Sequence, residues 1–110
     1  MPKRTRAPDH PILKDAWRHE VVGVHYDGLA DEPYLDLVLR HADSKMLRRL
    51  RFFSPQQVRI SGFPNMTWGL AISDVSSRGM EGIGVEVYDF ESSGPSAAEL
   101  YARDVVEVPA

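Results

Sequence analysis

Apolar residues alternate with polar or small residues across the segment 68–90. Leu70 and Ile72 are separated by one residue, and Val85 and Val87 repeat the same spacing further along the chain. A period of two places such residues on one face of a β-strand. The polar loop between the two runs contains two glycines, which suits a hairpin connection. The pattern predicts a β-hairpin with one buried face.

Similar alternation predicts further strands on both sides of this hairpin. In the first of them, Val22, Val24 and Tyr26 form one face, and His25 and Asp27 lie on the other. Turn residues such as proline, glycine, aspartate and serine separate the runs. The expected strands cover residues 19–27, 34–42, 45–53, 57–62 and 105–108, in addition to the two strands of the hairpin.

Residues 96–102 fit two structures. Ser96 and Glu99 have the spacing of a capping box, which begins a short helix. Leu100 and Ala102 equally continue a strand alternation. We prefer a strand preceded by a single turn.

The connections between the runs are short, and short connections require antiparallel neighbours. The expected fold is mainly β, with about seven antiparallel strands in a sandwich or open barrel that buries one face of each sheet. One or two short helices complete it, the first over residues 11–17 with Trp17 packed against the sheet. Residues 1–10 are expected to be a flexible basic tail, and residues 11–110 a single β-rich domain.

Composition excludes several classes of protein. The chain has 43% hydrophobic and 26% charged residues, which is ordinary for a globular domain. It has no cysteine, which excludes disulfides, thiolate zinc sites and cysteine nucleophiles. No run approaches the about 18 apolar residues of a membrane span, and the basic N-terminus precedes no signal-like apolar stretch. We therefore expect a cytoplasmic protein without membrane contact.

Charge is distributed unevenly along the chain. Residues 1–59 contain 11 Lys and Arg against 8 Asp and Glu, whereas residues 60–110 contain 2 against 8. The net charge of −3 therefore combines a basic first half with an acidic second half. Such a division is typical of a protein with one basic and one acidic surface, provided that the halves of the sequence are also separate in space.

The segment 68–106 contains three motifs in a fixed order. They are an aromatic-x-Leu-x-Ile-x-Asp-Val run, then Glu-Gly-Ile-x-Val-x-Val-x-Asp-x-Glu, then Tyr-Ala-x-Asp-Val. This order resembles small bacterial domains of unknown function. Those domains also carry an early His-x-Asp pair, matched here by His25 and Asp27. The resemblance covers about residues 17–108 and implies a small β-rich fold. Comparable domains include immunity proteins, which neutralise toxins by binding them, so the resemblance implies a binding role.

Three residues near the first strand have the chemistry of a metal site. His25 and Asp27 project from one face of the strand, and His19 has the same parity. Two imidazoles and a carboxylate are ligands for zinc or another divalent metal, and they equally suit a base with its orienting acid. The simpler interpretation is a His–Asp hydrogen bond at the end of a strand.

Arginines cluster in the middle of the chain. If the strands over 34–42, 45–53 and 57–62 are consecutive neighbours, four of these arginines share the outward face: Arg40, Arg49, Arg51 and Arg59. Arg48 has the opposite parity. Guanidinium groups bind carboxylates or phosphates, but only Phe53 adds an aromatic ring to this face. The simpler interpretation is a solvated face whose arginines pair with Asp36 and other acids.

The favoured function is a non-enzymatic module that binds a protein through this charged outer sheet face, as an immunity protein does. One alternative is a metal-dependent or acid/base enzyme centred on His25 and Asp27. Another is nucleic-acid binding through the arginine face. We expect a protein partner in preference to a nucleic acid, and no cofactor. The partner's identity and the oligomeric state stay open.

Overall fold

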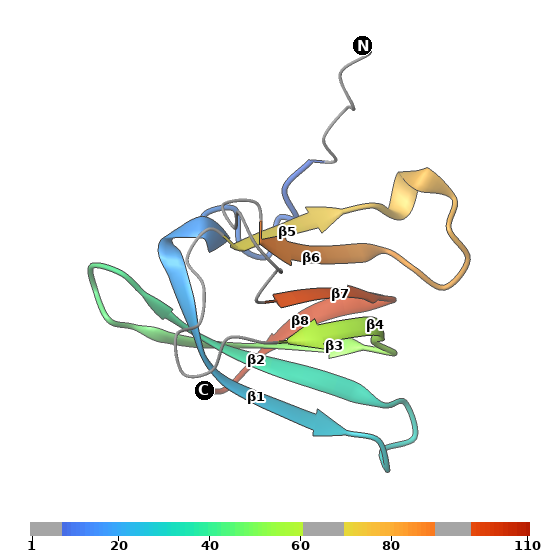
Figure 1. Cartoon of the computed structure of the whole chain (residues 1–110), viewed down its shortest axis with the longest axis horizontal. Coiled ribbons are helices and arrows are strands. Elements are labelled where there is room, and N and C mark those ends of the chain that lie inside the picture. Colours follow the sequence, from blue (N-terminus) through green and yellow to red (C-terminus); the bar gives the residue numbers. More distant parts are fainter. Residues whose placement is uncertain (1–7, 61–69, 90–97) are drawn as a thin grey trace.

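The computed structural model describes residues 8–60, 70–89 and 98–110, which form eight strands and two short 3₁₀ turns (Figure 1). The strands are β1 (His19–Asp27), β2 (Tyr34–His41), β3 (Leu47–Phe53), β4 (Gln56–Ile60), β5 (Leu70–Asp74), β6 (Val85–Asp89), β7 (Ala98–Ala102) and β8 (Asp104–Val108). The turns are η1 (Ala16–Arg18) and η2 (Ser76–Arg78).

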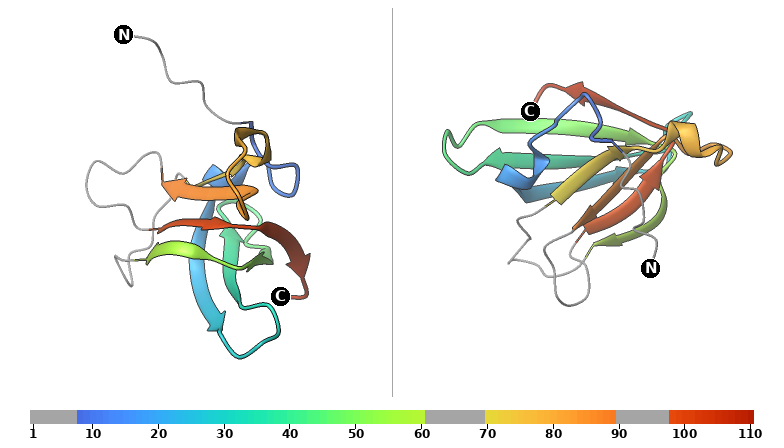
Figure 2. Two further views of the ribbon diagram at one scale, coloured as in Figure 1. Left: turned by 90° about the vertical axis from the view of Figure 1, so that its right-hand side faces the viewer. Right: turned by 90° about the horizontal axis from the view of Figure 1, so that it is seen from above.

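The strands form two antiparallel sheets. The first sheet has the order β1-β2-β3-β8, and the second has the order β4-β7-β6-β5. The predicted mainly β, antiparallel fold is confirmed, and the two sheets pack face to face with crossing strands (Figure 2). Residues 98–102 form a strand, as preferred above. The described residues hold one strand more than expected because Arg103 divides β7 from β8.

A bent two-stranded ribbon joins the two sheets. The chain passes from β3 to β4 at Ser54 and Pro55, and from β7 to β8 at Arg103. β3 pairs with β8, and β4 pairs with β7. Both strands of the ribbon therefore pass from the first sheet to the second at the same position along it. Ser54 has a φ of 50°, and the Arg103 amide donates to the Phe53 carbonyl at 2.8 Å. This corner turns β4 away from the first sheet.

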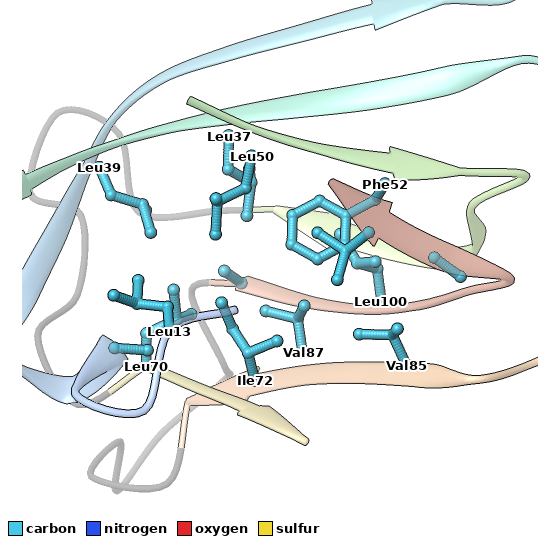
Figure 3. Packing of buried hydrophobic residues seen from close by; sticks show 14 of the residues in the cluster. Leu13, Leu37, Leu39, Leu50, Phe52, Leu70, Ile72, Val85, Val87 and Leu100 are labelled. Atoms are coloured by element: carbon cyan, nitrogen blue, oxygen red, sulfur yellow. The ribbon is translucent and has the colours of Figure 1, made fainter. Parts of the chain in front are cut away.

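Leucines of the first sheet face valines and isoleucine of the second across the core (Figure 3). Leu37, Leu39 and Leu50 have no exposed surface, and neither has Phe52. The alternation of the sequence places these side chains inward because β2 and β3 pair in a regular register. The opposing side chains in Figure 3 are Leu70, Ile72, Val85, Val87 and Leu100, with Leu13 at one end.

A β-bulge interrupts β1. Val21 pairs with Leu39, but Gly23 pairs with the next residue of β2, Val38, so Val22 is the extra residue. A bulge of one residue reverses the facing of every side chain beyond it. The single alternation expected for β1 is therefore wrong: Val21 faces the core, and Val22 is exposed.

The hairpin β5–β6 is confirmed, with Leu70 opposite Asp89 and Asp74 opposite Val85. Its expected single buried face is wrong for β5, where Ala71 and Ser73 are buried as well.

Residues 8–10, within the expected tail, add an antiparallel bridge along β5. There the His10 amide donates to the Ile72 carbonyl at 2.8 Å. Residues 1–7 lie outside the described part of the chain.

The segment before β1 differs from the expected helix. Residues 11–15 contain turns, and only η1 is helical. Ala16 of η1 is buried, whereas Trp17 is 49% exposed, so the expected packing of Trp17 against the sheet is wrong. Across the three described ranges, no helix has the length and apolar character of a membrane span.

Candidate functional site

The outer face of the first sheet carries a buried carboxylate. Its central row across the strands contains His25 of β1, Asp36 of β2, Arg51 of β3 and Val106 of β8. The Asp36 side chain is only 1% exposed, although it belongs to the face that points away from the core. A carboxylate is seldom buried unless it is paired, so its partners define this face.

Two arginines of β3 cover Asp36. Arg51 donates to both carboxylate oxygens, at 2.9 Å from Nε and 3.0 Å from Nη2. Arg49 Nε lies 3.1 Å from Asp36 Oδ2 on the other side, in an ion pair without hydrogen-bond alignment. The Asp36 hydrogen bond raises the pKa of Arg51. The three side chains form a fixed group with two positive charges and one negative charge, which we call the Asp36 cluster.

Aromatic rings surround the Asp36 cluster. The Arg51 guanidinium lies 3.8 Å from the centre of the Tyr34 ring, in the position of a cation–π contact. His25 lies on the other side of Tyr34, with ring centroids 6.4 Å apart. Arg51 is therefore held by the Asp36 carboxylate and by the Tyr34 ring.

The four expected arginines do not share one face. Arg40, Arg49 and Arg51 lie on the outer face of the first sheet, and Arg40 is paired with Glu20 of β1. Arg59 lies on β4 in the second sheet, so the expectation that it joins them is wrong. The physical reason is the corner at Ser54, which ends the pairing of consecutive strands. Arg48 has the opposite parity, as expected.

The three expected metal ligands are separated as well. His25 and Asp27 lie on the outer face, but the bulge places His19 on the inner face, where it is 2% exposed. Asp27 Oδ1 accepts the Leu29 amide at 2.9 Å and the Ala30 amide at 3.2 Å, which closes the turn after β1. In the described ranges, no three His, Asp or Glu side chains are placed to share a metal ion.

Charged residues also link the corner to the turn after β1. Glu32 accepts two hydrogen bonds from Arg103, at 2.6 Å and 2.8 Å, and a third from the Ser54 hydroxyl. The Arg103 hydrogen bonds lower the pKa of Glu32, with a further contribution from Ser54. Arg103 lies 5.6 Å from the Phe53 ring centre. This network borders the outer face at the end where the ribbon bends.

A cavity of about 320 Å³ lies at the other end of the first sheet. His19 and His41 line it side by side, with ring centroids 5.0 Å apart. Its remaining lining residues are Asp15, Ser44, Met46, Leu47, Arg48 and Glu107. Neither His41 nor Asp15 was among the residues predicted from the sequence. Regular counting outward from the turn at residues 28–33 places His41 opposite Glu20, and only the bulge at Val22 brings it opposite His19.

Known proteins add no independent information about this site. No protein-family model matches the chain, and no curated protein or solved structure matches it either. Function is therefore argued from the geometry of the outer face and of the cavity.

Proposed function

We propose that the chain is a non-enzymatic protein-binding module that docks its partner on the outer face of the first sheet, around the Asp36 cluster. The observation that supports this proposal is the burial of Asp36 under Arg49 and Arg51 on a face that is not otherwise covered in the described structure. Burying a carboxylate costs free energy unless its partners are held in place, so the cluster presents two ordered arginines.

Ordered arginine and tyrosine side chains are the residues that dominate binding energy at protein interfaces. Arg51 and Tyr34 are already stacked in the free protein, so a partner would not have to order them. Among the described residues, the terminal nitrogens of Arg49 have no hydrogen-bond partner, since only its Nε contacts Asp36. A carboxylate of the partner fits this vacant donor pair.

The charge balance of the face favours a protein over a nucleic acid. Arg40 is neutralised by Glu20, and the Asp36 cluster keeps one net positive charge. A phosphate backbone is bound by several unpaired cationic side chains, whereas an acidic side chain of a protein can be bound by one unpaired cationic side chain. The resemblance to immunity domains supports one form of the proposal, in which the partner is a toxin with an exposed acidic residue.

The test uses Arg49→Ala, with Arg59→Ala as the matched control on the second sheet. Partners captured by the immobilised wild-type chain are identified by mass spectrometry, purified, and titrated against each variant by calorimetry. We expect Arg49→Ala to weaken binding by about tenfold or more, which is about 1.4 kcal/mol. Arg59→Ala should leave the affinity unchanged. An affinity that is equal for Arg49→Ala and the wild type would contradict the proposal.

A further inference from the structure

The cavity at the His19 end of the first sheet takes no part in the proposed docking face. It opens on the inner face of that sheet, where β1, β2, β3 and β8 contribute side chains and the segment before β1 adds Asp15. Its volume of about 320 Å³ is within the range of small-molecule sites. The chemistry of its lining decides which molecules fit.

His19 presents a free acceptor to the cavity. Its Nδ1 lies 3.1 Å from the Asp15 carbonyl, an acceptor only, so Nδ1 carries the proton and donates. Nε2 of the neutral ring therefore holds a lone pair, and no described residue bonds to it. Desolvation lowers the pKa of His19, which keeps the ring neutral. An acceptor at Nε2 on a side chain that lines the cavity suits a ligand that donates a hydrogen bond.

Asp15 adds a second acceptor. The amides of Asp43 and Ser44 donate to Nδ1 of His41 at 3.1 Å and 3.2 Å, so the proton of this ring lies on Nε2. That nitrogen is 3.8 Å from Asp15 Oδ2, which is too far for a direct hydrogen bond. The Asp15 carboxylate thus keeps its accepting capacity toward the cavity.

Asp15 also carries the unbalanced charge of the site. Arg48 donates to both oxygens of Glu107, at 2.6 Å and 3.1 Å, and to the Ile12 carbonyl at 3.2 Å. These bonds pair Arg48 with Glu107, so the charged side chains Asp15, Arg48 and Glu107 of the lining together leave one net negative charge. An anion is disfavoured there, and a cation is attracted.

The same tautomers disfavour a metal ion. His41 holds its proton on Nε2 and accepts two amides at Nδ1, so it has no lone pair left for a metal. His19 and Asp15 alone would supply two ligands, fewer than zinc requires. Apolar surface is also present, because the Met46 side chain is 67% exposed at the border of the cavity.

We propose that this cavity binds a primary ammonium group on an aliphatic stem, with the ammonium donating to Nε2 of His19 and to the Asp15 carboxylate and the stem lying against Met46. Such a group occurs in a free alkylamine and in a lysine side chain of another protein. Both sources supply N–H donors, a positive charge and an apolar chain, which match the acceptors, the net negative charge and the apolar border of the lining.

The test is a titration of the full chain followed by the ¹⁵N signals of the histidine rings in NMR spectra. The probes are n-butylammonium, capped lysine, tetramethylammonium, butyrate and Zn²⁺. We expect saturable shifts at Nε2 of His19 with n-butylammonium or capped lysine, and at least about tenfold weaker binding of tetramethylammonium, which has no N–H donor. If capped lysine binds more tightly than n-butylammonium, the natural ligand is a protein side chain. If n-butylammonium binds equally tightly or more tightly, the natural ligand is a free amine.

Asp15→Asn is the decisive variant because Asp15 is half-exposed and its removal leaves the core intact. Asp15→Asn should weaken the binding of n-butylammonium by about tenfold or more. Asp43→Asn, a control outside the lining, should leave this affinity unchanged. The proposal is overturned if no ammonium probe gives saturable shifts, or if butyrate or Zn²⁺ binds at His19 more tightly than n-butylammonium. It is also overturned if Asp15→Asn binds n-butylammonium as tightly as the wild type.

Discussion

His19 and His41 meet edge to face across β1 and β2, with ring centroids 5.0 Å apart and planes at 83°. The contact joins the first residue of β1 to the last residue of β2. It places a buried imidazole at the mouth of a cavity, where the surroundings change its protonation.

Burial of His19 predicts a pH-dependent stability. Desolvation lowers its pKa below 6.5, with opposing contributions from Asp15. The unfolded chain therefore binds a proton at His19 before the folded chain does as the pH falls. Stability contributed by the neutral ring is present above pH 6.5 and is lost as the pH falls through the folded-state pKa. Between pH 6.5 and the folded-state pKa, the free energy of unfolding measured by urea denaturation should decrease as the pH falls. His19→Gln should reduce this dependence on pH. A slope identical in both proteins would contradict the expectation.

Loss of Arg51 should destabilise the protein more than loss of Arg40. Arg51→Ala removes both aligned hydrogen bonds of the buried Asp36 and leaves it only the misaligned Arg49. We expect a loss of about 1–3 kcal/mol in the free energy of unfolding, measured by urea denaturation. Arg40 forms an exposed pair with Glu20, so Arg40→Ala should cost about 1 kcal/mol or less. Equal losses would show that the burial of Asp36 does not depend on Arg51.

Deletion of Val22 should be tolerated. Val22 is the unpaired residue of the bulge and is 44% exposed, so its removal keeps both registers of β1 against β2. We expect a loss of no more than about 2 kcal/mol in unfolding free energy and an unchanged circular dichroism spectrum. Deletion of Val38 is the matched control in β2, because it shifts the register by one residue and exposes the leucines of the core. That variant should not fold.

Gly84 should resist any side chain. A Cβ at this position would lie 2.6 Å from the Arg103 carbonyl oxygen, and the Gly84 amide already donates to the Ala102 carbonyl at 2.9 Å. Gly84→Ala is expected to reduce the free energy of unfolding by about 1–3 kcal/mol, seen as a lower midpoint in thermal or urea denaturation. Ser77→Ala, at an exposed position of η2, should change it by no more than about 0.5 kcal/mol.

Alternation along the sequence was sufficient to predict most of the strands, because a buried face requires an apolar residue at every second position. It was insufficient where one residue changes the geometry. Val22 has the same side chain as Val21 and Val24, so the alternation does not distinguish it, although Gly23 beside it is the kind of residue that marks a bulge within a strand. Arg103 likewise continues a run of strand residues, although it separates β7 from β8.

The candidate sites depended on long-range pairing that the sequence does not display. The pairing of Arg49 and Arg51 with Asp36 follows from β2 and β3 being neighbours, and it was among the interpretations considered. The placement of Arg59 required knowledge of the corner at Ser54. Glu107 reaches Arg48 only because β8 lies beside β3, a pairing between distant parts of the chain.

The bent ribbon sets the order in which the molecule can assemble. β3 and β4 belong to the first half of the chain, and their partners β8 and β7 are synthesised last, so each sheet is completed only when residues 98–108 are present. Chains dominated by such distant contacts fold slowly, in about milliseconds to seconds. Until those residues are synthesised, β4 has no strand beside it, and the nascent chain presents an open edge to which other chains could attach.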